Sequence, residues 1–85
     1  MPMTVQVRLN AILRKYAGPD GQVDFATVLP VGAAVDDIIR KLGIPSEEVG
    51  LAAVNLKYAE RNQILAEGDR VILFPQLTGG RLVST

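Results

Sequence analysis

Two adjacent glycines, Gly79 and Gly80, follow the last long apolar run of the chain, and their pattern points to chemistry most directly. Residues without a Cβ suit a carboxylate that must enter a narrow enzyme channel and be attacked at its carbonyl carbon. Two structural interpretations compete with this one. The glycines could form a hairpin turn between residues 77–78 and 81–82, or they could belong to a frayed chain end.

The composition of the chain removes most catalytic chemistry. The 85 residues include no Cys and no His, which excludes thiolate nucleophiles, imidazole bases and metal sites built on either residue. Nine basic and nine acidic residues balance, and the basic ones form no stripe, so nucleic acid is not an expected partner. The chain shows neither a signal peptide pattern nor the roughly 20 apolar residues of a membrane span, so we expect a cytoplasmic protein without membrane contact.

The remaining titratable side chains have structural explanations. Asp36 and Asp37 stand at the start of an expected helix, where carboxylates complement the helix dipole. Glu47 and Glu48 stand in an expected short helical turn capped by Ser46. The tyrosines and lysines form no recognisable pair of base and nucleophile. The sequence therefore predicts a carrier or binding protein and not an enzyme.

Apolar periodicity predicts the elements that must position the two glycines. Period-two alternation predicts strands over residues 4–9 and 22–29, paired as an antiparallel hairpin. A short helical turn at residues 11–17 and a turn rich in Gly and Pro at residues 18–21 connect them. Helical spacing predicts an α-helix that ends at Gly43. The inner face of that helix carries Val35, Ile38, Ile39 and Leu42.

Shorter strands follow the helix. They are expected over residues 51–56, 63–65 and 70–74. The last one lacks alternation, as a central strand buried on both faces would, and Pro75 is expected to end it by withholding an N–H group.

The fold class that these elements predict is α+β, with a mixed sheet of four to five strands and one main helix packed across one face. Residues 1–75 form the predicted domain. Residues 76–85 are expected to be a flexible tail that carries the glycine pair.

Four segments in a consistent order carry a resemblance to a known family. They are residues 29–33 (Leu-Pro-Val-Gly-Ala), 53–55 (Ala-Val-Asn), 67–71 (Glu-Gly-Asp-Arg-Val) and 74–80 (Phe-Pro-Gln-Leu-Thr-Gly-Gly). Together they resemble the MoaD/ThiS family of ubiquitin-like sulfur carriers, whose fold is the β-grasp. The long first hairpin is most similar to that of the small subunit of molybdopterin synthase.

The resemblance implies a carrier that binds no cofactor itself. A ubiquitin-activating-type adenylating enzyme would use ATP to activate a glycine carboxylate, which then becomes a thiocarboxylate. The molybdopterin synthase large subunit, or another sulfur acceptor enzyme, would take the sulfur. By motif position, the resemblance assigns the adenylate and thiocarboxylate to Gly80 and passage through the channel to Gly79. Phe74 would face the partner, and Leu77 and Thr78 would lie along the inserted tail.

Three positions depart from the family pattern. Five residues follow Gly80, so three alternatives stay open: a processing protease removes residues 81–85, these residues are foreign to the natural chain, or the protein is not a carrier. Leu56 follows Asn55 where the family usually has glycine. Ala34 stands where a Ser or Thr helix cap is usual, which predicts a stability loss of about 1 kcal/mol.

Other functions of the same fold stay open at this point. The chain could be a ubiquitin-like protein modifier whose Gly80 is joined to target lysines. It could carry sulfur for thiamin or another metabolite. It could also be a β-grasp interaction module in which Gly79 and Gly80 form only a turn.

Overall fold

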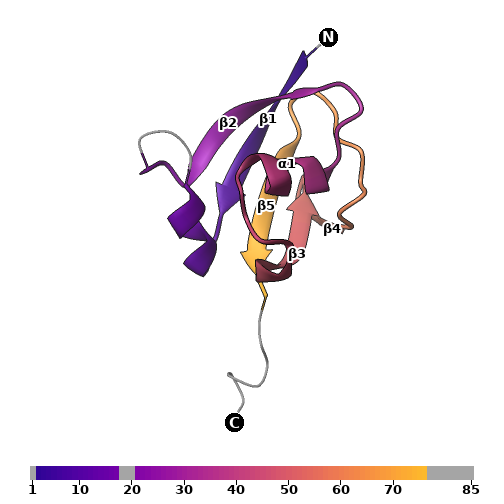
Figure 1. Ribbon diagram of the computed structural model, residues 1–85. Helices are drawn as coiled ribbons and strands as arrows, with labels where there is room; N and C mark the ends of the chain where they lie inside the picture. Colours follow the sequence, from indigo (N-terminus) through magenta and orange to yellow (C-terminus); the bar gives the residue numbers. More distant parts are fainter. Residues whose placement is uncertain (1, 18–20, 77–85) are drawn as a thin grey trace.

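The computed structural model describes residues 2–17 and 21–76 (Figure 1). In chain order, the elements within these ranges are β1 (Pro2–Leu9), η1 (Ala11–Tyr16), β2 (Asp24–Pro30), α1 (Val35–Lys41), η3 (Ser46–Glu48), β3 (Val49–Val54), β4 (Lys57–Ala59) and β5 (Arg70–Pro75). The elements η1 and η3 are 3-10 helices, and η1 is the helical turn that the sequence predicted. The expected turn at residues 18–20 and the tail at residues 77–85 lie outside the described residues.

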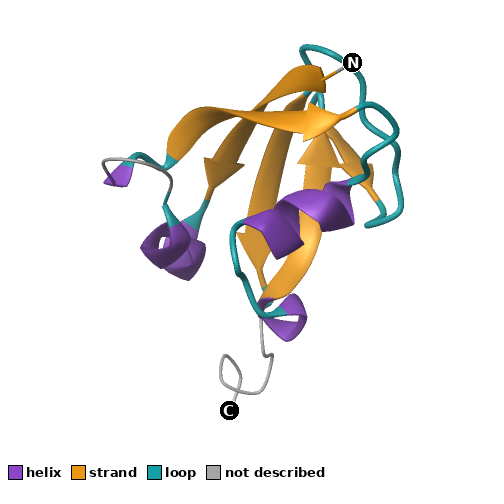
Figure 2. Cartoon of the chain, turned by 45° about the horizontal axis from the view of Figure 1, so that its top comes forward, coloured by secondary structure: helices purple, strands orange, loops and turns teal. Residues whose placement is uncertain are grey.

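The strands form one mixed sheet in the order β2-β1-β5-β3-β4. β1 and β5 run parallel, and every other neighbouring pair runs antiparallel. The helix α1 crosses one face of this sheet (Figure 2), and β5 points toward the end of the molecule where the chain leaves the fold (Figure 1). The predicted fold class and the predicted hairpin of the first two strands are confirmed.

The hydrophobic core lies between α1 and the sheet. Alternate side chains of β1 point into it, and each is at most 4% exposed; they are Met3, Val5, Val7 and Leu9. The helix contributes Val35, Ile38 and Ile39, each at most 1% exposed. Leu42 packs against the edge of the same cluster. Both predicted periodicities, two for the strand and 3.6 for the helix, are confirmed by this burial.

The start of α1 shows how an alanine is tolerated as its N-cap. The N–H group of Ala34 donates to Asp37 Oδ2 at 2.8 Å. The N–H groups of residues 35–36 donate to the carbonyl oxygens of Gln63 and Arg61, at 3.1 and 2.9 Å. The N–H of Asp37 donates to the carbonyl oxygen of Ala34 at 2.9 Å. The donors that a Ser or Thr cap would satisfy therefore already have partners.

The carboxylates at this helix start are structural, as predicted. Arg40 forms an ion pair with Asp36 at 2.6 Å and donates a second hydrogen bond to Asp37. The pKa of Asp37 is lowered, first by the N–H of Ala34 and then by Arg40, because both favour the ionised carboxylate. The same contacts raise the pKa of Arg40. Gly43 follows the helix with φ +72°, as expected of a residue that ends a helix.

The predicted strand at residues 63–65 is wrong. Of these residues only Ile64 makes an isolated bridge, to Ala34, and the carbonyl oxygen of Gln63 accepts from the first turn of α1. The segment therefore binds the helix start and does not extend the sheet. The fourth strand is instead β4, which pairs with β3 through Ala52 opposite Ala59 and Val54 opposite Lys57.

The predicted end of the third strand at residue 56 is also wrong, because Asn55 and Leu56 form a two-residue turn into β4. Their φ values are +52° and +72°, the pattern of a type I′ hairpin turn. The side chain of Asn55 donates to Asp69 Oδ1 at 2.8 Å and accepts from the N–H of Arg70 at 3.0 Å. These contacts hold the turn against the start of β5, whereas the side chain of Leu56 is 82% exposed.

The prediction that β5 is buried on both faces is half wrong. Val71 and Leu73 face the core and are fully buried, but Ile72 and Phe74 are only half-buried on the opposite face. That face lacks the cover that α1 gives to the first one (Figure 2). Although β5 is central in the sheet, only its face toward α1 is fully buried, and its other face is partly exposed.

Candidate functional site

The structure describes one of the five predicted site residues. Leu77, Thr78, Gly79 and Gly80 lie outside the described residues, so their assigned roles stay predictions. Phe74 lies near the end of β5, close to where the tail begins. Its side chain is half-buried on the uncovered face of the sheet, so it is available to a partner and is not part of the core cluster.

An apolar patch surrounds Phe74 on that face. Strand pairing places Leu51 opposite Phe74, and Ala53 opposite both Ile72 and Tyr58. Leu51 is 52% exposed and Tyr58 is 79% exposed. We call the set of Leu51, Tyr58, Ile72 and Phe74 the open-face patch. An exposed tyrosine and leucine beside half-buried apolar neighbours form a surface that a protein partner can cover.

A shallow groove of about 700 Å³ runs from the open-face patch to residues 75–76, which we call the tail root. Its lining includes Tyr58, Leu51 and Phe74 on one side and Pro75 and Gln76 at the end. A partner seated in this groove would therefore contact the residues from which the tail departs.

Charged side chains border the patch on β1 and β5. Arg8 lies opposite Ile72 in the parallel pairing and forms an ion pair with Asp24 at 3.7 Å. Arg70, earlier on β5, pairs with the same carboxylate at 3.8 Å. Two guanidinium groups share one carboxylate here, so this border carries a net positive charge beside the apolar patch.

The root of the tail is held more firmly than the sequence predicted. Pro75 is the last residue of β5, as predicted, and it still lies opposite Val49 in the antiparallel pair of β3 and β5. The N–H of Gln76 then donates to the carbonyl oxygen of Glu48 at 2.9 Å. The register shifts at Gly50, between residues 49 and 51, so Gly50 is a bulged residue beside the tail root.

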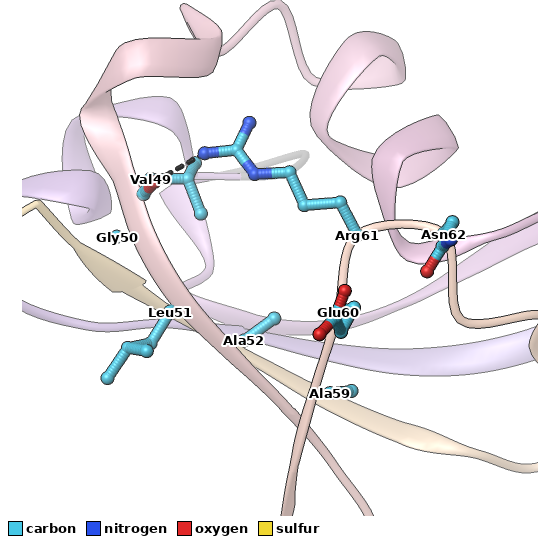
Figure 3. A pocket seen from close by; sticks show the side chains of 8 residues that line it. All are labelled: Val49, Gly50, Leu51, Ala52, Ala59, Glu60, Arg61 and Asn62. Carbon is cyan, nitrogen blue, oxygen red and sulfur yellow. Dashed lines mark hydrogen bonds between the residues drawn. The ribbon is translucent and has the colours of Figure 1, made fainter.

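The short helix η3 is fixed by an arginine that the sequence analysis missed. Arg61 donates to Ser46 Oγ, to the carbonyl oxygen of Ser46 at 2.7 Å and to the carbonyl oxygen of Val49. Figure 3 shows its guanidinium group reaching across to Val49. The predicted capping role of Ser46 is wrong, since Pro45 is the N-cap and the Ser46 hydroxyl accepts from Arg61 instead.

Tyr16 and Glu48 form the other polar contact near the tail root. The hydroxyl of Tyr16 donates to Glu48 Oε1 at 2.8 Å, and Lys15 approaches the same oxygen at 3.7 Å. The pKa of Tyr16 is raised, first by partial removal of the hydroxyl from water and then by the Glu48 carboxylate. The raised pKa keeps the Tyr16 hydroxyl protonated at neutral pH, as its role as a hydrogen-bond donor to Glu48 requires.

Within residues 2–17 and 21–76, no group of three potential metal-ligating carboxylates comes together. The same part of the chain has no helix long and apolar enough to cross a membrane.

The fold defines a ubiquitin-like β-grasp protein, in which one main helix covers one face of a mixed five-stranded sheet. The chain belongs to the ThiS family, whose model matches residues 7–80. The predicted resemblance to the MoaD/ThiS sulfur carriers is thereby confirmed. Members of this family are small carrier proteins that are generally not catalysts themselves.

Solved structures show the same fold. The putative molybdopterin converting factor, subunit 1, from Pyrococcus furiosus is 29% identical with a TM-score of 0.69, covering 86% of this chain and 97% of that one. The HVO 2177 protein of Haloferax volcanii is 23% identical with a TM-score of 0.75, covering 93% and 88%. The small archaeal modifier protein 1 of H. volcanii is 20% identical with a TM-score of 0.68, covering 86% and 97%. A search of curated proteins finds no match.

Proposed function

We propose that the chain is a sulfur carrier for molybdopterin synthesis, with Gly80 as the sulfur-bearing residue once residues 81–85 have been removed. The observation that carries this proposal is the family match, which runs from residue 7 to Gly80. The likeness to a protein described as a molybdopterin converting factor subunit favours molybdopterin over other sulfur-containing products.

The proposed chemistry takes place on the Gly80 carboxylate and uses the active sites of partners. A carboxylate oxygen attacks the α-phosphorus of ATP, pyrophosphate leaves, and an acyl adenylate forms. A sulfide-level nucleophile then attacks the carbonyl carbon and expels AMP, which leaves a thiocarboxylate. The thiocarboxylate sulfur then attacks an electrophilic carbon of the acceptor and displaces the leaving group there, which forms a thioester. Water cleaves the acyl–sulfur bond of this thioester, so the sulfur stays on the acceptor as a thiol and the carboxylate is restored. The chain itself supplies the docking surface and a tail whose glycines pass through a narrow channel.

The open-face patch is the proposed docking surface for the adenylating enzyme. Phe74 and Leu51 lie at the end of the patch that adjoins the tail root, and Tyr58 extends it to β4. Aromatic side chains at the centre of a patch commonly dominate binding energy. A partner that covers these residues would have the tail directed toward its own active site.

The first test is the intact mass of the chain isolated from its own cells. We expect a species that ends at Gly80, together with one heavier by the exchange of oxygen for sulfur. If every growth condition yields only chains that continue past Gly80, no carboxylate is available for activation and the proposal fails. Replacing Gly79 and Gly80 with alanine is the matched genetic test, since sulfur transfer should be lost while the fold is kept.

Conjugation to proteins is the second candidate, and its support is the fold shared with a small archaeal modifier protein. A modifier would use the same Gly80 adenylate but pass the acyl group to a lysine amine. Isopeptide-linked Gly80 in peptides from cell extracts would identify this route.

A β-grasp interaction module would instead keep its binding partner after both glycines are replaced.

A further inference from the structure

We infer that residues 46–50 form a clamp that fixes the point and the direction at which the tail leaves the fold, with Gly50, Glu48 and Arg61 as positioning residues. This inference rests on the proposed function, because it concerns how Gly80 is presented to the activating enzyme. None of these three residues takes part in the chemistry itself.

The clamp holds the tail root from two sides. On one side, the carbonyl oxygen of Glu48 accepts from the N–H of Gln76 at 2.9 Å. On the other side, Gly50 lies so close that a Cβ built on it would stand 2.7 Å from the carbonyl oxygen of Pro75 and 2.9 Å from Gln76 Cα. Both of these neighbours are backbone atoms, so a side chain at residue 50 would displace the chain at residues 75–76. Glycine is therefore required here by the close approach of two backbones.

Two other parts of the fold support the clamp from outside. Arg61, in the loop after β4, donates to the carbonyl oxygen of Ser46. It also donates to the carbonyl oxygen of Val49, as Figure 3 shows. Tyr16, on η1, holds the carboxylate of Glu48 at 2.8 Å. Two side chains far apart in the sequence thus bind residues 46–50, and within this segment Glu48, Val49 and Gly50 contact residues 75–76.

Fixing Gln76 shortens the segment between the fixed part of the fold and Gly80. This segment is then the four residues 77–80, and a chain of four residues reaches at most about 14 Å. If the clamp releases residues 75–76, the segment grows to six residues. Because effective concentration falls as roughly the −3/2 power of linker length, it drops about twofold, and losing the direction of departure lowers it further. The clamp therefore improves capture of Gly80 by the activating enzyme.

The variant that tests the clamp is Gly50→Ala, made in a chain that ends at Gly80. Removing residues 81–85 disturbs no described contact, because the described fold ends at Gln76. Gly68→Ala is the matched control. Gly68 has φ +83° and open space around its missing Cβ, so alanine there strains a turn before β5 without touching the tail root.

Two readouts decide the outcome. Amide hydrogen exchange measures whether the N–H of Gln76 is protected, and ATP–pyrophosphate exchange by the cell's own adenylating enzyme measures KM and kcat. We expect Gly50→Ala to lose protection at Gln76 while that at Leu73 is kept, and to raise KM about two- to fivefold with kcat unchanged. Gly68→Ala should leave Gln76 protected and KM unaltered.

Other results would overturn the inference in identifiable ways. Unchanged protection at Gln76 in Gly50→Ala, or lost protection with an unchanged KM, would show that the clamp does not position the tail. If the unaltered chain is not adenylated at all, the proposed function fails, and the exchange experiment still decides whether the clamp exists.

A second variant covers the case in which Gly50→Ala does not fold. Arg61→Ala removes three hydrogen bonds to the clamp and adds no atom near residues 75–76. The N–H of Gln76 should therefore lose protection without any steric clash. Arg61→Lys keeps one charged donor, and partial recovery of both protection and KM is expected. If the lysine variant behaves like the alanine variant in both readouts while its fold is intact, Arg61 is not a positioning residue.

Discussion

The turn between β3 and β4 places a leucine where glycine is usual, and this position offers a sharp test of the backbone description. Leu56 has φ +72°, in the left-handed region, which costs a residue with a Cβ about 1–2 kcal/mol. Its side chain is 82% exposed, so removing it forfeits little packing. Glycine would relieve the strain but lose about 0.5–1 kcal/mol through the greater freedom of the unfolded chain. The net expectation for Leu56→Gly is a gain of about 0.5–1 kcal/mol.

Urea denaturation followed by circular dichroism measures this change, with Leu56→Ala as the control. Alanine removes the same exposed side chain but keeps the Cβ, so its stability should stay within about 0.5 kcal/mol of the unaltered chain. For a domain of this size, the gain in the glycine variant corresponds to a rise in Tm of roughly 2–8 °C. Equal gains in both variants, or no gain in the glycine variant, would refute the assignment of backbone strain to Leu56.

Three further outcomes are expected. Ala34→Ser should change stability by less than about 0.5 kcal/mol in urea denaturation, because the helix donors already have partners; a gain near 1 kcal/mol would show that one is free. The lowered pKa of Asp37 adds stability that is present above its unfolded pKa of about 3.9 and is lost as pH falls through the folded value. Asp37→Asn should therefore make stability depend less on pH in that acid range. The raised pKa of Tyr16 acts at the other extreme, adding stability that is present below its unfolded pKa of about 10 and lost as pH rises through the folded value; Tyr16→Phe should remove this alkaline loss.

Strong periodicity made much of the fold predictable. The alternating residues of β1 and the helical spacing of Val35, Ile38 and Ile39 both describe surfaces that face one core, so local pattern and tertiary burial agree. The errors fall where backbone groups serve a neighbouring element. Residues 63–65 have an apolar character typical of a strand, yet their segment satisfies the donors at the start of α1. The periodicity of a segment does not show that its backbone carbonyl groups accept hydrogen bonds from another element.

The candidate site was predictable in part. Phe74 was identified by its motif, and the structure places it on the open face, but its apolar neighbours come from β3 and β4, whose exact bounds the sequence did not reveal. The role of Gly50 was not predictable from local pattern, because it is steric and depends on where β5 ends. Arg61 gave no signal, because its acceptors are backbone carbonyls that any residue can supply.

The position of β5 has a mechanical consequence. β5 is bonded to β1 on one edge and to β3 on the other, and it runs directly into the tail. A force that pulls the tail acts along the axis of this strand. It therefore shears both rows of hydrogen bonds, those to β1 and those to β3. Because these bonds lie across the direction of the force, they must break together. A tail extending an edge strand would let the bonds break one at a time. We therefore expect the domain to resist unfolding when a pulling force is applied to the chain that follows β5.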